Sequence, residues 1–256
     1  MLNRKQKINF LLFIAVVATV VVFFMPCIPQ NADYNRFADT RTICSVPNFY
    51  NVVSNLLFLV FGSLGIFITV YFRDKKEPDP TFGANLFFFL GILLTGIGSS
   101  YYHLHPATNA LLWDRLPMTV TFMAFFAVII SEHIDQLTGK RILFHLLFLG
   151  IISVIYWYKT ELNGHGDLRF YGLVQFLPML LIPSILLLFR SESQFSFYYW
   201  CILVVYLLAK LSEHLDHEIY SLTGFISGHS LKHVFASVAP LIYFVKLWSE
   251  KIFEKV

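Results

Sequence analysis

An all-α bundle of membrane-spanning helices is the fold that this sequence predicts, and three observations lead to it. Of the 256 residues, 57% are hydrophobic and only 14% are charged, whereas about a quarter of the residues in a soluble domain are charged. The apolar residues gather in blocks of about twenty, the length that crosses ~30 Å of hydrocarbon as a helix. Short polar links separate the blocks and leave no room for a soluble domain. The net charge of +3 is small and lies at the flanks of the blocks, so we expect no nucleic-acid partner.

Eight spans are predicted, with seven helices in residues 31–256 and one additional helix in residues 1–30. In order, they cover residues 8–25, 51–72, 83–103, 115–134, 142–158, 170–189, 195–215 and 229–248. The first span follows Arg4, Lys5 and Lys7, a start that also suits a secretory signal peptide. Its apolar run is long for a signal peptide, and residues 23–26 offer no small-residue cleavage site. We therefore expect an uncleaved helix.

The distribution of Lys and Arg orients the bundle. With the N-terminus inside, twelve flank the inner ends of the spans: Arg4, Lys5, Lys7, Arg73, Lys75, Lys76, Lys140, Arg141, Arg190, Lys246, Lys251 and Lys255. Five flank the outer ends: Arg36, Arg41, Arg115, Lys159 and Arg169. Positive charge favours the cytoplasmic side, so both termini are expected in the cytoplasm.

Three groups of polar residues, two within spans and one in a link between spans, have structural interpretations. Asn51, Ser54 and Asn55 repeat at helical spacing. They could orient groups of the site or tie the second span to its neighbours, and we favour the packing role. Lys210 and Glu213 are three residues apart and are interpreted as a structural ion pair. The link at 163–167 is interpreted as a simple turn.

The cysteines leave one question open. Cys27 and Cys44 share the first outer loop, where they could form a disulfide or remain free thiols. Cys201 lies within the seventh span and is interpreted as a packing residue.

Ionisable groups near one end of the bundle are the candidate functional residues. His229 and His233 are four apart on the last span, so both side chains project from one face. His103, at the same predicted depth on the third span, can supply a third nitrogen. Three neutral imidazoles leave one tetrahedral position for water, which is the pattern of a catalytic zinc site. The spacing alone is also compatible with interfacial histidines that bind nothing.

Ser99 and Asp114 are the candidate catalytic residues beside these histidines. Ser99 lies one turn before His103 on the same face, and its alternative role is that of a small residue at a close helix contact. Asp114 could accept a proton from zinc-bound water or orient a histidine. Its alternative role is an N-cap of the fourth span, with Pro117 in the first helical turn.

The five positions together resemble a known family. Ser99-x-x-x-His103, Asp114 and His229-x-x-x-His233 are similar to the alkaline ceramidases, members of the CREST group of seven-helix membrane hydrolases. The segment Phe49-Tyr50-Asn51-x-x-Ser54-Asn55 resembles the start of the ceramidases' first helix. Four segments look most like prokaryotic members: 37–41, 98–103, 113–118 and 228–233. The resemblance covers nearly the whole chain after Asn31, with the first span as an addition.

This resemblance implies zinc held by His103, His229 and His233, with Ser99 and Asp114 beside the metal-bound water. It also implies hydrolysis of a lipid amide to a fatty acid and an amine. Animal members bind calcium through an acidic segment before their first helix, but Asn48 stands where one of its glutamates would align. Residues 33–35 and Asp39 are an imperfect substitute for that segment, and we do not expect a calcium site.

We therefore predict an integral membrane, zinc-dependent amidohydrolase that takes a ceramide-like or other N-acyl lipid from the membrane. A bacterial inner membrane with the site near its outer face suits the short loops and the resemblance. One alternative is a receptor-like or signalling protein with a structural zinc site and little turnover. Another is a transporter or redox protein whose histidines bind haem or relay protons. The sequence leaves the choice of N-acyl lipid or ester and the oligomeric state open.

Overall fold

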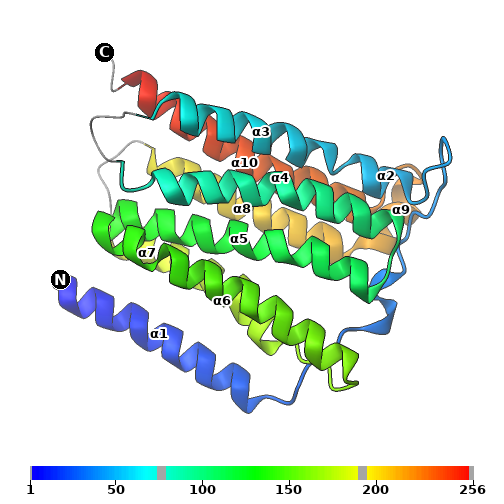
Figure 1. The fold of residues 1–256 in the computed structure, drawn as a ribbon, viewed down its shortest axis with the longest axis horizontal. Coiled ribbons are helices and arrows are strands. Elements are labelled where there is room, and N and C mark those ends of the chain that lie inside the picture. Colours follow the sequence, from blue (N-terminus) through cyan, green and yellow to red (C-terminus); the bar gives the residue numbers. More distant parts are fainter. Residues whose placement is uncertain (1, 74–78, 190–194, 254–256) are drawn as a thin grey trace.

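Long α-helices make up most of the protein in a computed structural model that describes residues 2–73, 79–189 and 195–253 (Figure 1). The long helices are α1 (Arg4–Phe24), α3 (Leu56–Tyr71), α4 (Phe82–Leu104), α5 (Thr108–His133), α6 (Gln136–Leu162), α7 (Arg169–Leu188), α8 (Ser196–His214) and α10 (Gly228–Phe253). Three short elements complete the chain: the 3-10 helix η1 (Ala32–Asn35), α2 (Phe49–Val53) and α9 (Asp216–Thr223). The described residues contain no β-strand, only one isolated bridge between Ile43 and Val46. The predicted all-α class is confirmed.

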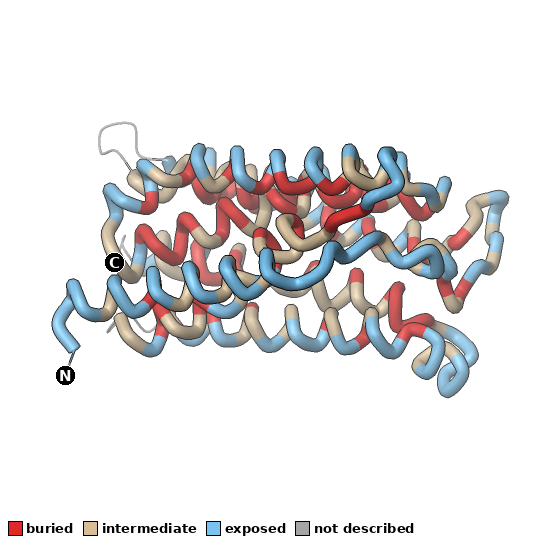
Figure 2. The backbone as a smooth tube through the Cα atoms, turned by 90° about the horizontal axis from the view of Figure 1, so that it is seen from below, coloured by how far each residue is buried: buried red, intermediate tan, exposed pale blue. Residues whose placement is uncertain are grey.

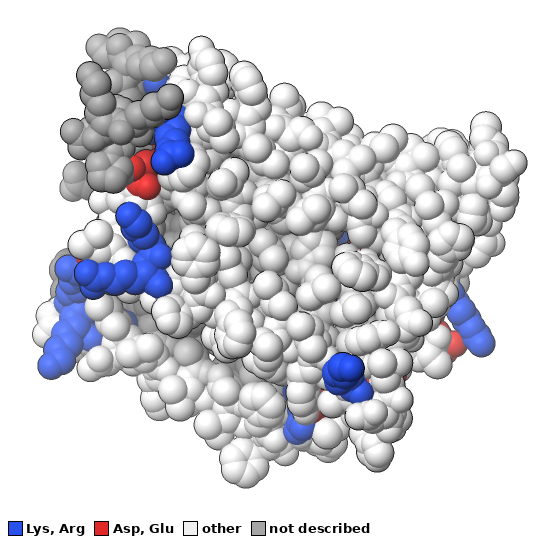
Figure 3. Space-filling view, viewed as in Figure 1, with Lys and Arg blue, Asp and Glu red and all other residues white. Residues whose placement is uncertain are grey.

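The long helices run side by side as a bundle, with both termini at one end and α2 and α9 at the other (Figure 1). Among the described residues, seven helical segments are long and apolar enough to cross a membrane. The eighth long helix, α8, is not among these seven segments and packs against α10. Lys and Arg lie mainly toward the two ends, and the middle of the face in Figure 3 is almost uncharged. These features identify an integral membrane protein.

Helix α1 stands at the edge of the bundle. Among the described helices it contacts mainly α7, and most of its surface is exposed (Figure 2). The chain after α1 is anchored by Arg169, which donates hydrogen bonds to the carbonyls of Phe23 and Met25. Asp167 holds Arg169 in an ion pair of 2.8 Å and is only 1% exposed. The link at 163–167 is therefore an anchor for α1 as well as a turn.

The start of the fourth span differs from the prediction. Helix α5 begins at Thr108, seven residues before the predicted start at Arg115, and its N-cap is Ala107. The interpretation of Asp114 as an N-cap is therefore wrong, and Pro117 lies inside the helix. No helix-breaking residue lies between Thr108 and Trp113, and the charged pair that suggested an interface is buried in the bundle, Asp114 at 8% and Arg115 at 5% exposure.

Other parts of the described chain add detail that periodicity did not provide. The second span is divided at Ser54–Asn55 into α2 and α3, and α9 follows α8 as an unpredicted short helix.

Lys246, counted above among the inner flanks, is only 1% exposed and pairs with Glu132 and Glu250 inside the bundle. Cys27 and Cys44 are free thiols. The predicted inner-flank residues Lys75, Lys76, Arg190 and Lys255 lie outside the described residues.

Candidate metal centre and adjoining cavity

Three buried histidines meet at the end of the bundle opposite the termini. His103 lies in the last turn of α4, and His229 and His233 lie in the first two turns of α10. One ring nitrogen from each lies within 4.8 Å of the others, and no other group of three or more metal-ligating side chains was found among the described residues. The predicted grouping of His103 with the His229/His233 pair is confirmed.

The spacing of these nitrogens suits a transition metal. The Nε2 atoms of His103 and His229 are 3.3 Å apart. Two nitrogens bound at the usual ~2.0–2.1 Å on a tetrahedral ion would be separated by roughly 3.3–3.4 Å. The observed distance between the two nitrogens therefore matches the spacing of two ligands on one metal ion. The donor set therefore fits a metal ion with three imidazole ligands.

A hydroxyl on the second span orients His233. The Nδ1 atom of His233 lies 2.9 Å from Ser54 Oγ, and the Ser54 hydroxyl donates to the carbonyl of Asn51. Because that hydroxyl hydrogen is already used, Ser54 accepts from Nδ1–H, which leaves the Nε2 lone pair for the metal. The packing interpretation of Ser54 was thus incomplete. The three-residue spacing of Ser54 from Asn51 indicated that they share a helix face, but it did not identify His233 as the partner of Ser54.

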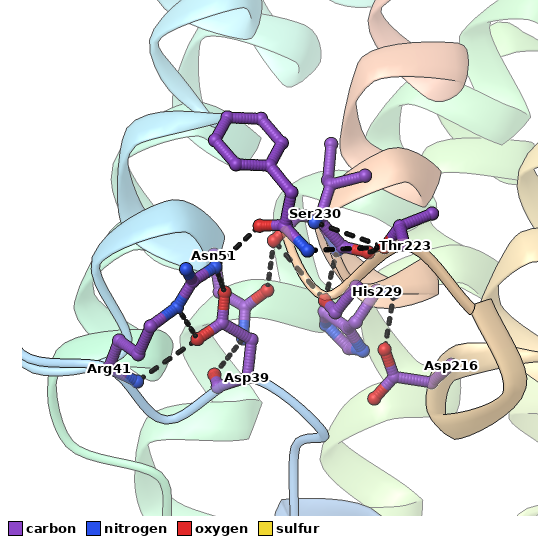
Figure 4. A network of polar contacts seen from close by, with 10 residues as sticks. Asp39, Arg41, Asn51, Asp216, Thr223, His229 and Ser230 are labelled. Carbon is purple, nitrogen blue, oxygen red and sulfur yellow. Dashed lines mark hydrogen bonds and ion pairs between the residues drawn. The ribbon is translucent and has the colours of Figure 1, made fainter. Parts of the chain in front are cut away.

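The first turn of α10 is held by residues from two other segments (Figure 4). The backbone N–H of His229 donates to Asp216 Oδ1 at 2.7 Å, and the other carboxylate oxygen accepts from the N–H of Ala38. Ser230 donates to Asn51 Oδ1 at 2.6 Å. An acidic group at a helix N-terminus satisfies free N–H groups and the positive end of the helix dipole. Asp216 is a supporting residue that the sequence interpretation missed.

The loop before α2 covers the histidines. Phe37 packs against the rings of His103 and His229, with ring centroids 4.8 Å apart in both cases. Asn35 accepts a hydrogen bond from the Tyr102 hydroxyl. Phe37, in the segment 37–41 noted above for its resemblance, therefore covers one side of the cluster.

The acidic residues of this loop have partners of their own. Asp39 pairs with Arg41, and the exposed Asp33 pairs with Arg36. Burial raises the pKa of the Asp39 carboxyl, but the hydrogen bonds and charge of Arg41 outweigh it and bring that pKa below its ordinary value. The Asp39 carboxylate is therefore engaged by a cation of the protein.

Ser99 and Asp114 lie together across the contact between α4 and α5. The Ser99 hydroxyl lies beside the Asp114 carboxyl, and both side chains line a cavity that also reaches His233. Gly98 makes this approach possible, because a Cβ there would collide with the carbonyl of Trp113. The structure thus places Ser99, Asp114 and His233 in the lining of one cavity, and His103 and His229 lie beside His233 in the histidine cluster.

The cavity has a volume of about 660 Å³ and is lined mostly by apolar side chains. The helices that contribute them are α1, α3, α4, α5, α7, α8 and α10. Its polar lining includes Ser99, Asp114, Arg115, Glu213, Lys232 and His233. Ligand cavities commonly have about this size, and the combination suits an amphiphile with its polar group near the histidines.

A lysine between the two histidines of α10 was not assigned a role from the sequence. Lys232 Nζ lies 2.9 Å from Glu213 Oε1 and 3.1 Å from His229 Nε2. The predicted Lys210–Glu213 pair is confirmed at 2.8 Å, but Glu213 is shared between both lysines. Position 232 lies within two residues of a predicted ligand, and this proximity was the only signal available.

Comparison with known proteins gives one match. A family model described as Ceramidase matches residues 40–254, which include α2 to α10 and leave α1 outside. A search of curated proteins found no match.

Proposed function

The chain belongs to the ceramidase family, and from that premise we propose that it is a zinc-dependent hydrolase. Its substrate would be a ceramide-like or other N-acyl lipid, cleaved at the amide bond to a fatty acid and an amine. The observation that carries the proposal is the position of the histidine cluster at the polar end of a largely apolar cavity. A site that hydrolyses a lipid amide needs both a polar end that can bind a metal and room for an acyl chain.

The histidines and the two catalytic candidates have separate tasks in this proposal. His103, His229 and His233 would hold the zinc ion, which when bound polarises a carbonyl and makes a water molecule more acidic. Asp114 accepts a proton from the attacking water as the C–O bond forms. It returns that proton to the amine nitrogen as the C–N bond breaks.

Ser99 stabilises the charge that develops during this reaction. Its hydroxyl lies beside Asp114, so it can reach the same reacting group and donate to the carbonyl oxygen as that oxygen becomes negative. Such a donor contributes on the order of 3 kcal/mol to transition-state stability. The acyl chain would enter the apolar cavity laterally from the membrane.

The proposed location is a bacterial inner membrane, with both termini cytoplasmic and the site near the outer face. The basic residues near the termini support this orientation. In this arrangement residues 1–30 form an added helix on a seven-helix catalytic domain of residues 31–256. The contact of α1 with α7 at the edge of the bundle supports that division.

Metal content and hydrolysis, measured on the same purified preparations, test the proposal. Wild type should hold about one zinc per chain and release fatty acid from an N-acyl lipid. His233→Ala should lose both properties, while His105→Ala, an exposed histidine next to the cluster, should lose neither. Zinc-free preparations of active wild type would contradict the assignment.

Asp114→Asn separates a hydrolase from a receptor-like protein with a structural zinc site. The amide cannot accept the proton from water, so kcat should fall about 10²–10⁴-fold while zinc content stays at the wild-type level. Fatty acid release is measured by mass spectrometry. An unchanged kcat in this variant would remove Asp114 from the mechanism.

A further inference from the structure

The polar end of the cavity carries more positive than negative side chains. Arg115, Lys210 and Lys232 line it together with two acids, Asp114 and Glu213, which leaves one excess positive charge. Arg169 also lines the cavity but is paired with Asp167. An uncompensated charge is costly in a membrane interior, so this excess calls for an anion.

Arg115 is the cation without an acidic partner. It is 5% exposed, and no Asp or Glu among the described residues lies within ion-pair distance of it. Its guanidinium carbon lies 4.1 Å from the ring centroid of Trp157 and 4.9 Å from that of Tyr171. These rings stabilise the cation but do not neutralise it. One nitrogen, Nη2, donates to Gln30 Oε1, whereas Nη1 is buried without any hydrogen-bond acceptor.

Lys232 and Lys210 share a single carboxylate. Glu213 Oε1 accepts from Lys232 and Oε2 accepts from Lys210, at 2.9 and 2.8 Å. The remaining contact of Lys232 is the Nε2 atom of His229. A metal held by His229 would use that lone pair, so Lys232 would keep a hydrogen free for another acceptor beside the metal.

Tyr34 connects these cations into one site. Its hydroxyl donates to Glu213 at 3.3 Å, and its ring faces the Arg115 guanidinium at 5.5 Å. Burial raises the pKa of the Tyr34 hydroxyl well above its ordinary value, so it remains a neutral donor. Arg115 and Lys232 therefore both border the space next to the histidine cluster.

We propose that the cavity takes N-acyl lipids whose amine portion carries an anionic oxygen group, and that Arg115 and Lys232 bind that group. The carboxylate of an N-acyl amino acid and the phosphate of a phosphorylated N-acyl amino alcohol share this chemistry. A neutral ceramide would leave Arg115 without a counter-ion. This inference rests on the proposed amide hydrolysis for the position of the scissile bond, and it narrows the substrate class.

Matched substrate pairs test it on the full-length, zinc-loaded protein. N-oleoylglycine is compared with neutral N-oleoylglycinamide, and ceramide 1-phosphate with ceramide, so that the scissile amide is kept within each pair. Charge-assisted hydrogen bonds predict a kcat/KM about 10- to 100-fold higher for at least one anionic member. The pair with the larger ratio identifies carboxylate or phosphate as the ligand group. Equal kcat/KM values within both pairs would overturn the inference and leave the hydrolase proposal intact.

Variants then assign the preference to residues. Arg115→Gln and Lys232→Gln should each bring the ratio of the two kcat/KM values toward one, mainly by lowering the value for the anionic member. Arg115→Lys should restore part of the ratio because it keeps the charge. A full preference retained in Arg115→Gln would overturn the assignment to Arg115, and the wild-type ratio remains a test even if that variant does not fold.

A binding measurement separates this inference from the proposed reaction. Anionic members should raise the thermal midpoint of the protein more than neutral ones, and that readout needs no turnover. If the anionic members bind selectively but no amide is cleaved, the hydrolase proposal fails and the inference stands. If oleate alone shows Arg115-dependent binding and neither anionic substrate is preferred, the cations hold the fatty acid product and the inference is wrong.

Discussion

Ser54 illustrates how a single side chain can set the properties of the candidate metal centre. Its hydroxyl accepts from His233 Nδ1–H and donates to the carbonyl of Asn51. It thereby determines which imidazole nitrogen faces the other two histidines. Outer hydrogen bonds of this kind commonly affect metal affinity without changing the ligand set.

Replacing Ser54 should therefore weaken metal binding more than it weakens the fold. Ser54→Ala removes the acceptor for His233 Nδ1–H, and we expect a zinc affinity about 10- to 100-fold lower, measured by competition with a chelator. Ser100→Ala is the matched control, because the Ser100 hydroxyl bonds only to the Gly96 carbonyl of its own helix. Equal zinc affinity in the two variants would show that Ser54 does not orient the ligand.

Arg115 and Lys232 show that residue type alone does not determine which partner a charged side chain has. From the sequence, Arg115 was counted only among the basic residues at the outer ends of the spans, and Lys232 was given no role. Their partners lie far along the chain: Arg115 bonds to Gln30, and Lys232 bonds to Glu213. No local periodicity identifies such partners, because they depend on how each helix is rotated in the bundle.

Helix pairs determine whether the two catalytic candidates meet. Helices α4 and α5 approach so closely at Gly98 that a Cβ there would collide with the Trp113 carbonyl. The collision is with backbone, which cannot rotate away as a flexible side chain can. The glycine is therefore needed for the distance between Ser99 and Asp114.

Gly98→Ala should separate these two helices at the site. We expect kcat to fall at least about tenfold and stability to fall by roughly 1–3 kcal/mol, as for other overpacked helix contacts. The control is Gly83→Ala on the same helix, where a Cβ makes only an ordinary contact of 3.4 Å with the Leu143 side chain. Fatty acid release and the thermal midpoint are measured for both variants, and wild-type activity in Gly98→Ala would contradict the role of this contact.

The link between α6 and α7 anchors α1 through Asp167 and Arg169. Hydrogen bonds from Arg169 outweigh the effect of burial and lower the pKa of Asp167 to about 2. Its unfolded value is about 3.9. A carboxyl with a depressed folded pKa stabilises the protein above its unfolded pKa, and this contribution is lost as the pH falls through the folded value.

Asp167→Asn should therefore have a pH-dependent effect. Near pH 7 the variant should be less stable by about 1 kcal/mol, since ion pairs near the surface are partly screened. The difference from wild type should shrink as the pH falls from about 4 toward 2. Thermal midpoints across this range measure it, with Asp33→Asn, at an exposed ion pair, as the control. A difference in thermal midpoint between wild type and Asp167→Asn that stays constant at all pH values would contradict this role of the Asp167 carboxylate.

The two ends of the bundle carry different features. Both termini lie at one end, and the histidine cluster lies at the other. Cys27 and Cys44 are exposed, and both precede α2. With α8 as an eighth crossing, as the sequence predicts, one side of the membrane should hold both termini and the other should hold this loop.

Thiol labelling in intact cells tests this direction. A membrane-impermeant maleimide should label Cys44 from outside, in a Cys27→Ser, Cys201→Ser background. A cysteine placed at Lys5, near the N-terminus, should react only after the membrane is permeabilised. The opposite pattern would place the site on the cytoplasmic side, without affecting the identity of the site residues.

Sequence alone determined the class of the protein and most of the candidate site. Spans of about twenty apolar residues and the scarcity of charge predict the helical bundle, because both are local requirements of the hydrocarbon core. The His229/His233 spacing is likewise local, since one helix turn places both side chains on one face. His103, Ser99 and Asp114 were found because polar residues at the ends of different spans share a depth.

Only the tertiary structure decided what each polar group contacts. It corrected Asp114 from a helix cap to a buried residue beside Ser99, and it brought Ser54 to His233 and Asp216 to the start of α10. It also showed that no acidic side chain among the described residues pairs with Arg115 at the polar end of the cavity. The physical reason is that helical periodicity defines a face and a depth, whereas partners depend on the rotation, tilt and close approach of helices that are distant in the chain.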